Sequence, residues 1–322
     1  MIDSGHVATA NRACALLYSF IKEQPQGIWL LPVNVCPDVP LTFALAGIQF
    51  QFVDINPQTL CIDIDDCKRR IKNKDSNVTG IVYVRTYGFL TDTSELFFSL
   101  KDANPGMRII DDRCLCIPEV PVNYGNADMI LYSTGHCKPI DFGGGGLAFY
   151  ARPTIYNCDV NLFYDGTDEE RLYKEAYANK ATLSLIPQGW LQLGKYKNPD
   201  IYLQEISQCV NDRILQREEL NMIYRESLPD SIQLKMEYQN WRFNILVPST
   251  IKNELLNTLF ENGLFASSHY HSANRLFDTC EYMYSDRLFC QIINLFNDKY
   301  YTAEKAIRTC EIINEVYKKR IN

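Results

Sequence analysis

Two apolar runs in the middle of the chain each end in side chains that could do chemistry. Residues 107–110 are followed by a pair of aspartates, the second of which is Asp112. Residues 129–132 are followed by Ser133 and, five residues later, by Lys138. Short apolar runs of this kind predict buried strands of a parallel sheet, whose carboxyl ends meet at one edge. We therefore expect a carboxylate and a lysine at the same edge of a sheet.

A lysine and a carboxylate in this arrangement suit pyridoxal phosphate (PLP). The lysine forms a Schiff base with the cofactor aldehyde, and the carboxylate keeps the pyridine nitrogen protonated so that the ring accepts electrons. The ordinary alternative is a solvated loop lysine and two turn-forming aspartates. The rest of the chain bears on the choice between these interpretations.

Length and charge exclude several classes of protein. The 322 residues are enough for one large domain and a smaller one with a substantial core. A net charge of −7 argues against general binding to nucleic acid or to an anionic membrane surface. No apolar segment approaches the roughly 20 residues that a membrane span needs. The first residues do not resemble a secretory signal, so we expect a cytoplasmic protein.

The twelve cysteines are scattered along the chain. There is no Cys-x-x-Cys pair and no Cys/His cluster with the spacing of a zinc site, so we expect no metal. Cys114 and Cys116 are too close in sequence for a typical disulfide. A reduced protein that uses cysteine as a small apolar residue fits this pattern better.

Strand and helix patterns alternate along the first part of the chain. Strands are expected at 28–31, 50–55, 80–84, 107–110 and 129–132, and helices at 10–21, 36–47, 63–71 and 92–100. The segment from Ser4 to His6 is expected to cap the first helix, where free N–H groups could also bind an anion. The alternation predicts an α/β fold with a mostly parallel central sheet covered by helices and a ligand site at the carboxyl ends of the strands.

The second part of the chain predicts a smaller α+β domain. A long helical pattern at 204–228 leads to a strand at 241–247, a helix at 251–262, a strand at 292–296 and a helix at 303–317. Residues 164–187 have no clear pattern. We therefore expect a large α/β domain over 1–228 and a small domain over 229–322.

Several motifs occur in an order that one family shares. They read FVDINPQT, YGFLTD, IIDDRC and YSTGHCKPIDFGGGG. Together they resemble the strand ends FVDIDxxT, YGxxxD, EDAAQ and SFxxxKxxxxGEGG of the DegT/DnrJ/StrS family of PLP-dependent sugar aminotransferases, which has the type I aminotransferase fold. The resemblance extends through the C-terminal segments GLFASSHYHS and INLFNDKYYTAEKA, so it covers nearly the whole chain.

The resemblance implies roles for individual residues. Lys138 would be the Schiff-base lysine and the proton carrier, and Asp112 would pair with the pyridine nitrogen. Ser133, together with Gly5 and His6, would hold the cofactor phosphate. All four histidines fall in loops predicted to surround or approach the cofactor, at positions 6, 136, 269 and 271. His269 aligns with a family histidine near the substrate.

Five positions depart from the family pattern. His6 stands where the family has the threonine of its SGT phosphate loop. The aromatic residue that stacks on PLP aligns with Cys36, the glutamine after the aspartate with Leu115, the glutamate of GEGG with Gly144, and an arginine with Pro199. Loss of an aromatic stack costs roughly 1 kcal/mol beyond the lost burial, so the departures weaken the cofactor site. That arginine lies in a segment that reaches the phosphate of a neighbouring subunit, where Lys197 or Asn198 would stand in.

The function implied by the resemblance is amino transfer. An amino group would move from an amino acid, for which we expect glutamate, to a nucleotide-linked keto sugar used in surface polysaccharides or antibiotics. The resemblance also implies a homodimer with shared active sites. One alternative is a related dehydratase, but those enzymes carry histidine where Lys138 stands. The other is a non-catalytic member that keeps the fold and the dimer, as Cys36, Leu115 and Gly144 would allow.

Overall fold

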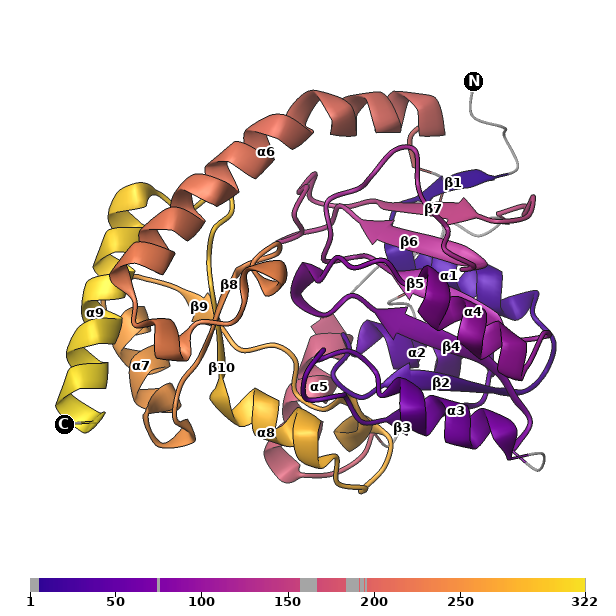
Figure 1. The fold of residues 1–322 in the computed structure, drawn as a ribbon, viewed down its shortest axis with the longest axis horizontal. Coiled ribbons are helices and arrows are strands. Elements are labelled where there is room, and N and C mark those ends of the chain that lie inside the picture. The colour runs from indigo at the N-terminus through magenta and orange to yellow at the C-terminus, as the bar shows by residue number, and fades with distance from the viewer. Residues whose placement is uncertain are drawn as a thin grey trace.

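Two sheets joined by one long helix make up the fold. The computed structural model describes residues 6–73, 76–156, 167–183, 191, 194 and 196–321. The long helix, α6 (Pro199–Ser227), runs from the larger sheet to the smaller one (Figure 1). Within these described ranges, no helix has both the length and the apolar character needed to cross a membrane.

The larger sheet has seven strands in the order β1-β7-β6-β5-β4-β2-β3. Their bounds are β1 (Val7–Ala10), β2 (Ile28–Pro32), β3 (Phe50–Val53), β4 (Val78–Val84), β5 (Arg108–Asp112), β6 (Met129–Ser133) and β7 (Gly146–Tyr150). Neighbours among β2 to β6 pair in parallel, whereas β7 pairs antiparallel with both β6 and β1. The predicted mostly parallel sheet is confirmed.

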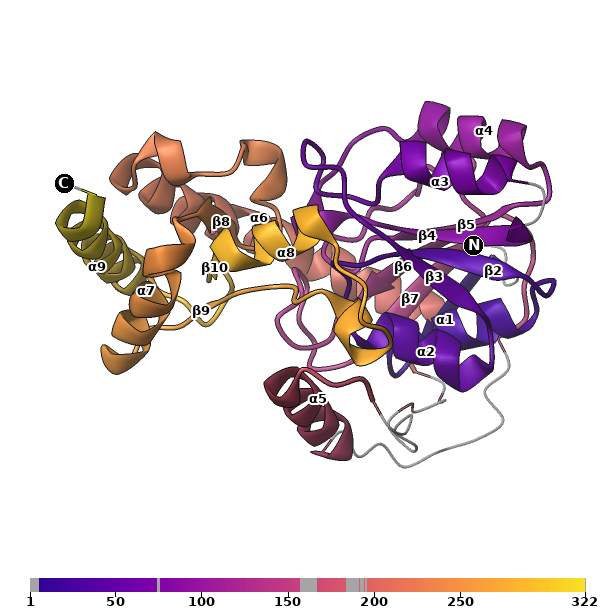
Figure 2. The same cartoon turned by 90° about the horizontal axis from the view of Figure 1, so that it is seen from below.

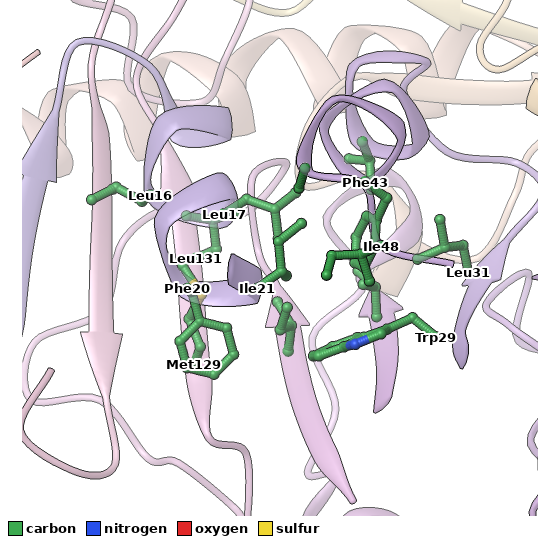
Figure 3. Close-up of a cluster of buried hydrophobic side chains, with 14 of the residues drawn as sticks. Leu16, Leu17, Phe20, Ile21, Trp29, Leu31, Phe43, Ile48, Met129 and Leu131 are labelled. Atoms are coloured by element: carbon green, nitrogen blue, oxygen red, sulfur yellow. The ribbon is translucent and has the colours of Figure 1, made fainter. Parts of the chain in front are cut away.

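Helices cover both faces of this sheet, as Figure 2 shows. One face carries α1 (Ala13–Lys22) and α2 (Asp38–Ala46), and the other carries α3 (Ile64–Lys72) and α4 (Ser94–Ala103). Because side chains alternate along a strand, Trp29 and Leu31 of β2 join the core under α1 and α2, whereas Leu30 joins the opposite core. Figure 3 shows Leu17 of α1 packed over Leu131 of β6 in the first core.

The same alternation separates the two aspartates at the end of β5. Ile110 belongs to the core under α1 and α2, and Ile109 belongs to the opposite core. Two residues further along the strand, Asp112 follows Ile110 and Asp111 follows Ile109. The adjacent carboxylates therefore face opposite sides of the sheet.

The smaller sheet is antiparallel and has the strand order β8-β10-β9. Its elements are β8 (Phe243–Leu246), α7 (Ser249–Glu261), β9 (Ala266–Ser267), α8 (Met283–Gln291), β10 (Ile292–Leu295) and α9 (Ala303–Ile321). Its core includes Tyr224 from α6, Phe243, Ile293 and Ile313. We propose a domain boundary at residue 228, because α6 ends at Ser227 and every strand of the smaller sheet follows it.

The N-terminal segment corrects the predicted first helix. Of the helix predicted over 10–21, Ala10 ends strand β1 instead, and α1 starts only at Ala13. The four-residue run VATA is too short to separate strand from helix by periodicity. Sequence patterns also left out β9, α8 and helix α5 (Thr167–Asn179), which lies within the unassigned 164–187 segment. Short 3₁₀ turns at Thr86–Gly88, Asp230–Ile232, Met236–Tyr238 and Ala273–Leu276 complete the elements.

Candidate active site

Asp112 and Ser133 lie at the carboxyl edge of the larger sheet. β5 and β6 pair in parallel, with Asp112, the last residue of β5, opposite Leu131. β6 therefore extends two residues further, to Ser133. Asp112 is buried and accepts a hydrogen bond from the backbone N–H of Cys114 at 2.9 Å. Ser133 ends β6 and is also buried.

Lys138 is carried by a tight loop that follows β6. The carboxylate of Asp141 accepts hydrogen bonds from the backbone N–H groups of Cys137, at 3.1 Å, and Gly143, at 2.8 Å. Phe142 N–H donates to the carbonyl of Thr134 at 2.9 Å. These bonds close the loop on itself and return the chain to β7.

A cavity of about 720 Å³ lies at this edge of the sheet. Its walls come from the start of α1, the ends of β5 and β6, the Lys138 loop and the glycine turn. The lining residues are Asn11, Arg12, Ala13, Cys14, Leu17, Cys36, Asp38, Val39, Asp112, Cys114, Leu131, Ser133, Gly135, His136, Lys138, Gly143, Gly144, Gly145 and Tyr196. The structure thus brings together four predicted site residues, at positions 36, 112, 133 and 138.

The first turn of α1 is the part of the cavity that sequence reasoning missed. Arg12 is the N-cap residue but makes no side-chain cap bond, and its guanidinium pairs with Asp38 at 3.0 Å. A Cβ on Gly146 would lie 2.6 Å from Ala13, so the glycine allows β7 to approach this helix end closely. One signal in the sequence could have revealed this turn. The apolar spacing changes after Asn11 from the short run VATA to the spacing of a helix.

His6 lies far from this cavity, which corrects its expected placement beside Ser133. Val7 pairs with Phe149, and Ser133 pairs with Gly146 at the other end of β7. The Nδ1 atom of His6 lies 2.8 Å from the Tyr150 carbonyl oxygen. His6 therefore sits at the amino edge of the parallel strands. Ser4 and Gly5 lie outside the described residues.

Asn198 is also separate from the cavity lining. Its side-chain oxygen caps α6 by accepting hydrogen bonds from the N–H groups of Asp200, at 2.9 Å, and Ile201. Lys197 pairs with Glu205 at 2.6 Å. The neighbouring Tyr196 is the residue of this segment that lines the cavity.

The smaller domain brings His269 and Tyr270 toward Lys138. The His269 ring lies 5.6 Å from the Trp241 ring and 4.9 Å from the Tyr270 ring, and its backbone carbonyl accepts a hydrogen bond from Tyr87 at 2.6 Å. Of the other histidines, His136 is exposed at the cavity mouth, and His271 packs 4.3 Å from the Tyr177 ring.

Burial and charge shape the titration of the central residues. Burial raises the pKa of Asp112, and the nearby Lys138 partly opposes this rise. Burial alone would lower the pKa of Lys138, but interactions with Tyr270, the two thiols Cys114 and Cys36, and Asp112 raise it overall. The net upward shift of its pKa means that Lys138 holds its proton more tightly than a free lysine does.

Replacing His269 by glutamine should reduce the acid sensitivity of the fold. Burial, followed by the charges of Arg242 and Lys138, lowers the pKa of His269 to about 3. The unfolded chain, with a pKa near 6.5, takes up the proton first, so stability falls as pH drops from about 6.5 towards 3. Urea unfolding at about pH 7 and about pH 4.5 should show a loss smaller by roughly 2 kcal/mol in His269→Gln.

The control for this experiment is His136→Gln, because the His136 side chain is 80% exposed. That variant should keep the pH dependence of the original protein. An unchanged pH dependence in His269→Gln would contradict the assignment of a neutral, partly buried imidazole at position 269.

The fold and this cavity define a class of protein. No protein-family profile matches the chain, and no curated protein matches it. Solved structures of PLP-dependent aminotransferases do match, over nearly the whole length, so the chain has the type I aminotransferase fold.

Three of these structures illustrate the similarity. The aminotransferase PseC from Helicobacter pylori, involved in pseudoaminic acid biosynthesis, is 15% identical with a TM-score of 0.71 and covers 98% of this chain and 87% of its own. A DegT/DnrJ/EryC1/StrS aminotransferase from Brucella abortus is 16% identical with a TM-score of 0.69, covering 96% and 85%. NtdA from Bacillus subtilis, solved with the cofactor PMP, is 18% identical with a TM-score of 0.67, covering 97% and 73%.

Proposed function

We propose that this chain is a PLP-dependent aminotransferase. The observation that carries the proposal is that Lys138, Asp112 and Ser133 line one cavity at the carboxyl edge of the sheet. A partly buried lysine whose charge interacts with the buried carboxylate of Asp112 has the perturbed titration that is typical of functional sites. The aminotransferase fold supports the same assignment.

The residues around the cavity fit PLP. Asp112 would hold the pyridine nitrogen through a charge-assisted hydrogen bond. Ser133 and the amino end of α1 would hold the phosphate, because a helix amino end favours an anion. Lys138 supplies the amine for the aldehyde. Cys36 would face the ring where an aromatic residue is usual, which makes this contact smaller.

Each of these side chains has a defined task in amino transfer. When bound, PLP supplies a ring that stabilises negative charge on the carbon bearing the transferred amino group. Lys138 would accept a proton from that carbon and return it at the other end of the transfer. Asp112 would keep a negative charge beside the ring nitrogen, and the half-buried thiols Cys36 and Cys114 line the same cavity. Burial raises the pKa of both thiols, so they stay protonated and act as apolar walls.

We further propose the substrate class. The amino acceptor would be a nucleotide-linked keto sugar and the donor glutamate, in a cytoplasmic homodimer with shared active sites and a role in polysaccharide or antibiotic sugar synthesis. The similar structures support a sugar acceptor, since one of them, PseC, is an aminotransferase involved in pseudoaminic acid biosynthesis. His269 would contact the substrate from the smaller domain, and Asn198 would serve the phosphate only by leaving its helix-capping position.

A non-catalytic relative is the second candidate. Leu115, which aligns with a polar family residue, is buried in an apolar cluster with Tyr87 and Trp241. Cys36 removes the aromatic stack. Both features favour a protein that keeps the fold without turnover.

The test of the proposed function is PLP binding to one lysine. We expect a new absorbance band near the edge of the visible range on adding PLP. After borohydride reduction, peptide mass mapping should find the pyridoxyl label on Lys138. Label on Lys197, which is partly exposed close to the cavity, would indicate non-specific reaction. Absence of a band at saturating PLP would favour the non-catalytic relative.

A further inference from the structure

The loop that carries Lys138 is held at three alternate backbone carbonyls by side chains from far along the chain. Each side chain donates one hydrogen bond. The pairs are Trp241 Nε1 with Cys137 O at 2.7 Å, Arg217 Nη2 with Pro139 O at 3.2 Å, and Lys299 Nζ with Asp141 O at 2.9 Å. We call these three side chains the carbonyl clamp.

We propose that the carbonyl clamp of Trp241, Arg217 and Lys299 positions Lys138 in the cavity, so that the placement of the lysine depends on α6 and on the smaller domain. The assignment of a catalytic task to Lys138 rests on the proposed function. The clamp itself rests on the hydrogen bonds above. None of the three side chains lines the described cavity, so they act through Lys138 and not on a substrate.

The loop needs outside support because its own contacts are weak at the lysine. The backbone N–H of Lys138 donates to Gly135 O at a long 3.3 Å. Cys137 has a φ of 60°, in the left-handed region that is unfavourable for residues with a Cβ. The Trp241 hydrogen bond is made to the carbonyl of this residue. A contact from outside the loop therefore stabilises the turn that precedes Lys138.

Arg217 joins three segments at once. Its Nη1 donates to Trp241 O at 2.7 Å and to Asn297 Oδ1 at 2.8 Å, while Nη2 reaches the loop. Burial lowers the pKa of Arg217 to about 10. In the described part of the chain, its hydrogen bonds go to two carbonyls and one amide and not to a carboxylate. The rigid, planar guanidinium therefore uses its hydrogen bonds to hold these three segments in a fixed arrangement.

Trp241 is itself held in place by its neighbours. Its ring stacks on Tyr87, with centroids 6.4 Å apart and 7° between the planes, and the Arg242 guanidinium lies 4.5 Å from its centre. Substitution by phenylalanine keeps an aromatic ring among these neighbours and removes the Nε1 donor. The chain offers a matched control in Trp29, which is fully buried and whose Nε1 has no hydrogen-bond partner in the described structure.

Hydrogen exchange of the loop tests the clamp without any cofactor. In Trp241→Phe, the bonded N–H groups of Cys137, Lys138 and Phe142 should exchange about fivefold to tenfold faster, as expected for loss of one hydrogen bond. Trp29→Phe should leave these rates unchanged. A second pair of variants covers the case in which Trp241→Phe folds poorly. Lys299→Met removes a hydrogen-bond donor from a half-buried side chain. Its control is Lys305→Met, which removes an ammonium that lies 5.9 Å from a tyrosine ring.

The pH titration of the absorbance of PLP attached to Lys138 gives a second readout. Its midpoint should move in Trp241→Phe and Lys299→Met and stay in place in the two controls. If the unmodified protein does not bind PLP, the proposed function fails, while hydrogen exchange still decides the clamp. If loop exchange in both clamp variants equals that of their controls, the clamp is overturned even where PLP binds.

Discussion

Replacement of Lys138 by alanine is expected to slow amino transfer at least about 1000-fold. The variant loses both the amine that attaches the cofactor and the group that moves the proton, and a positioned acid–base group alone contributes about 10²–10⁴-fold. The measurement is the spectral conversion of bound PLP to its amino form after glutamate is added. Lys138→Ala should also show no pyridoxyl label after borohydride reduction.

The matched control for Lys138→Ala is Lys197→Ala. Lys197 lies beside the cavity residue Tyr196 but pairs with Glu205 at the surface. The resemblance offers Lys197 as a phosphate contact, but its ammonium is already paired with Glu205 at 2.6 Å, so its removal should leave the spectral conversion close to that of the unmodified protein. A conversion rate that survives the loss of Lys138 and falls with the loss of Lys197 would mean that the chemistry is assigned to the wrong lysine.

Asp111→Asn is expected to destabilise the folded protein by about 3–5 kcal/mol, the usual cost of breaking a buried ion pair. Asp111 is fully buried and accepts hydrogen bonds from Arg85 at 2.7 and 2.8 Å and from Arg113 at 2.9 Å. Both arginines are buried, so the neutral amide would leave Arg85 without this carboxylate and Arg113 with only the more exposed Glu119, at 3.2 Å. Urea unfolding at neutral pH measures the loss.

Asp112→Asn is the neighbouring control, and it should separate stability from function. Burial raises the pKa of Asp112, so ionisation at neutral pH destabilises the folded state and removal of the charge should change stability by less than about 1 kcal/mol. The variant should nevertheless lose amino transfer, because an amide cannot keep the pyridine nitrogen protonated. Equal stability losses in the two variants would contradict the separation of the two carboxylates.

The fold class follows from local features of the sequence. Alternating apolar runs and helical periods predict the parallel sheet and its helices, and most predicted bounds lie within a few residues of the observed ones. The order of Asp112, Ser133 and Lys138 is also local, since all three fall within a short stretch at the ends of two adjacent strands. That they share a cavity is now a structural observation, and their roles remain predictions.

The proposed phosphate end of the candidate site was not predictable in the same way. Sequence similarity placed it at Gly5 and His6, whereas the turn beside Ser133 is formed by residues 11–13. The difference depends on β1, which pairs with β7 some 140 residues away in the chain, as the register of Val7 with Phe149 shows. The direction of that pairing decides which end of the strand reaches the cavity.

By itself, then, the sequence determined the class of fold and the residue types at the strand ends, because both depend on neighbours along the chain. Only the tertiary structure decided toward which face of the sheet Asp111 and Asp112 each point. It also decided that α1 begins beside the cavity and that three donors distant in sequence hold the Lys138 loop. Strand register and side-chain hydrogen bonds across the two domains set these features. Such contacts join residues that are far apart in sequence and leave no local pattern.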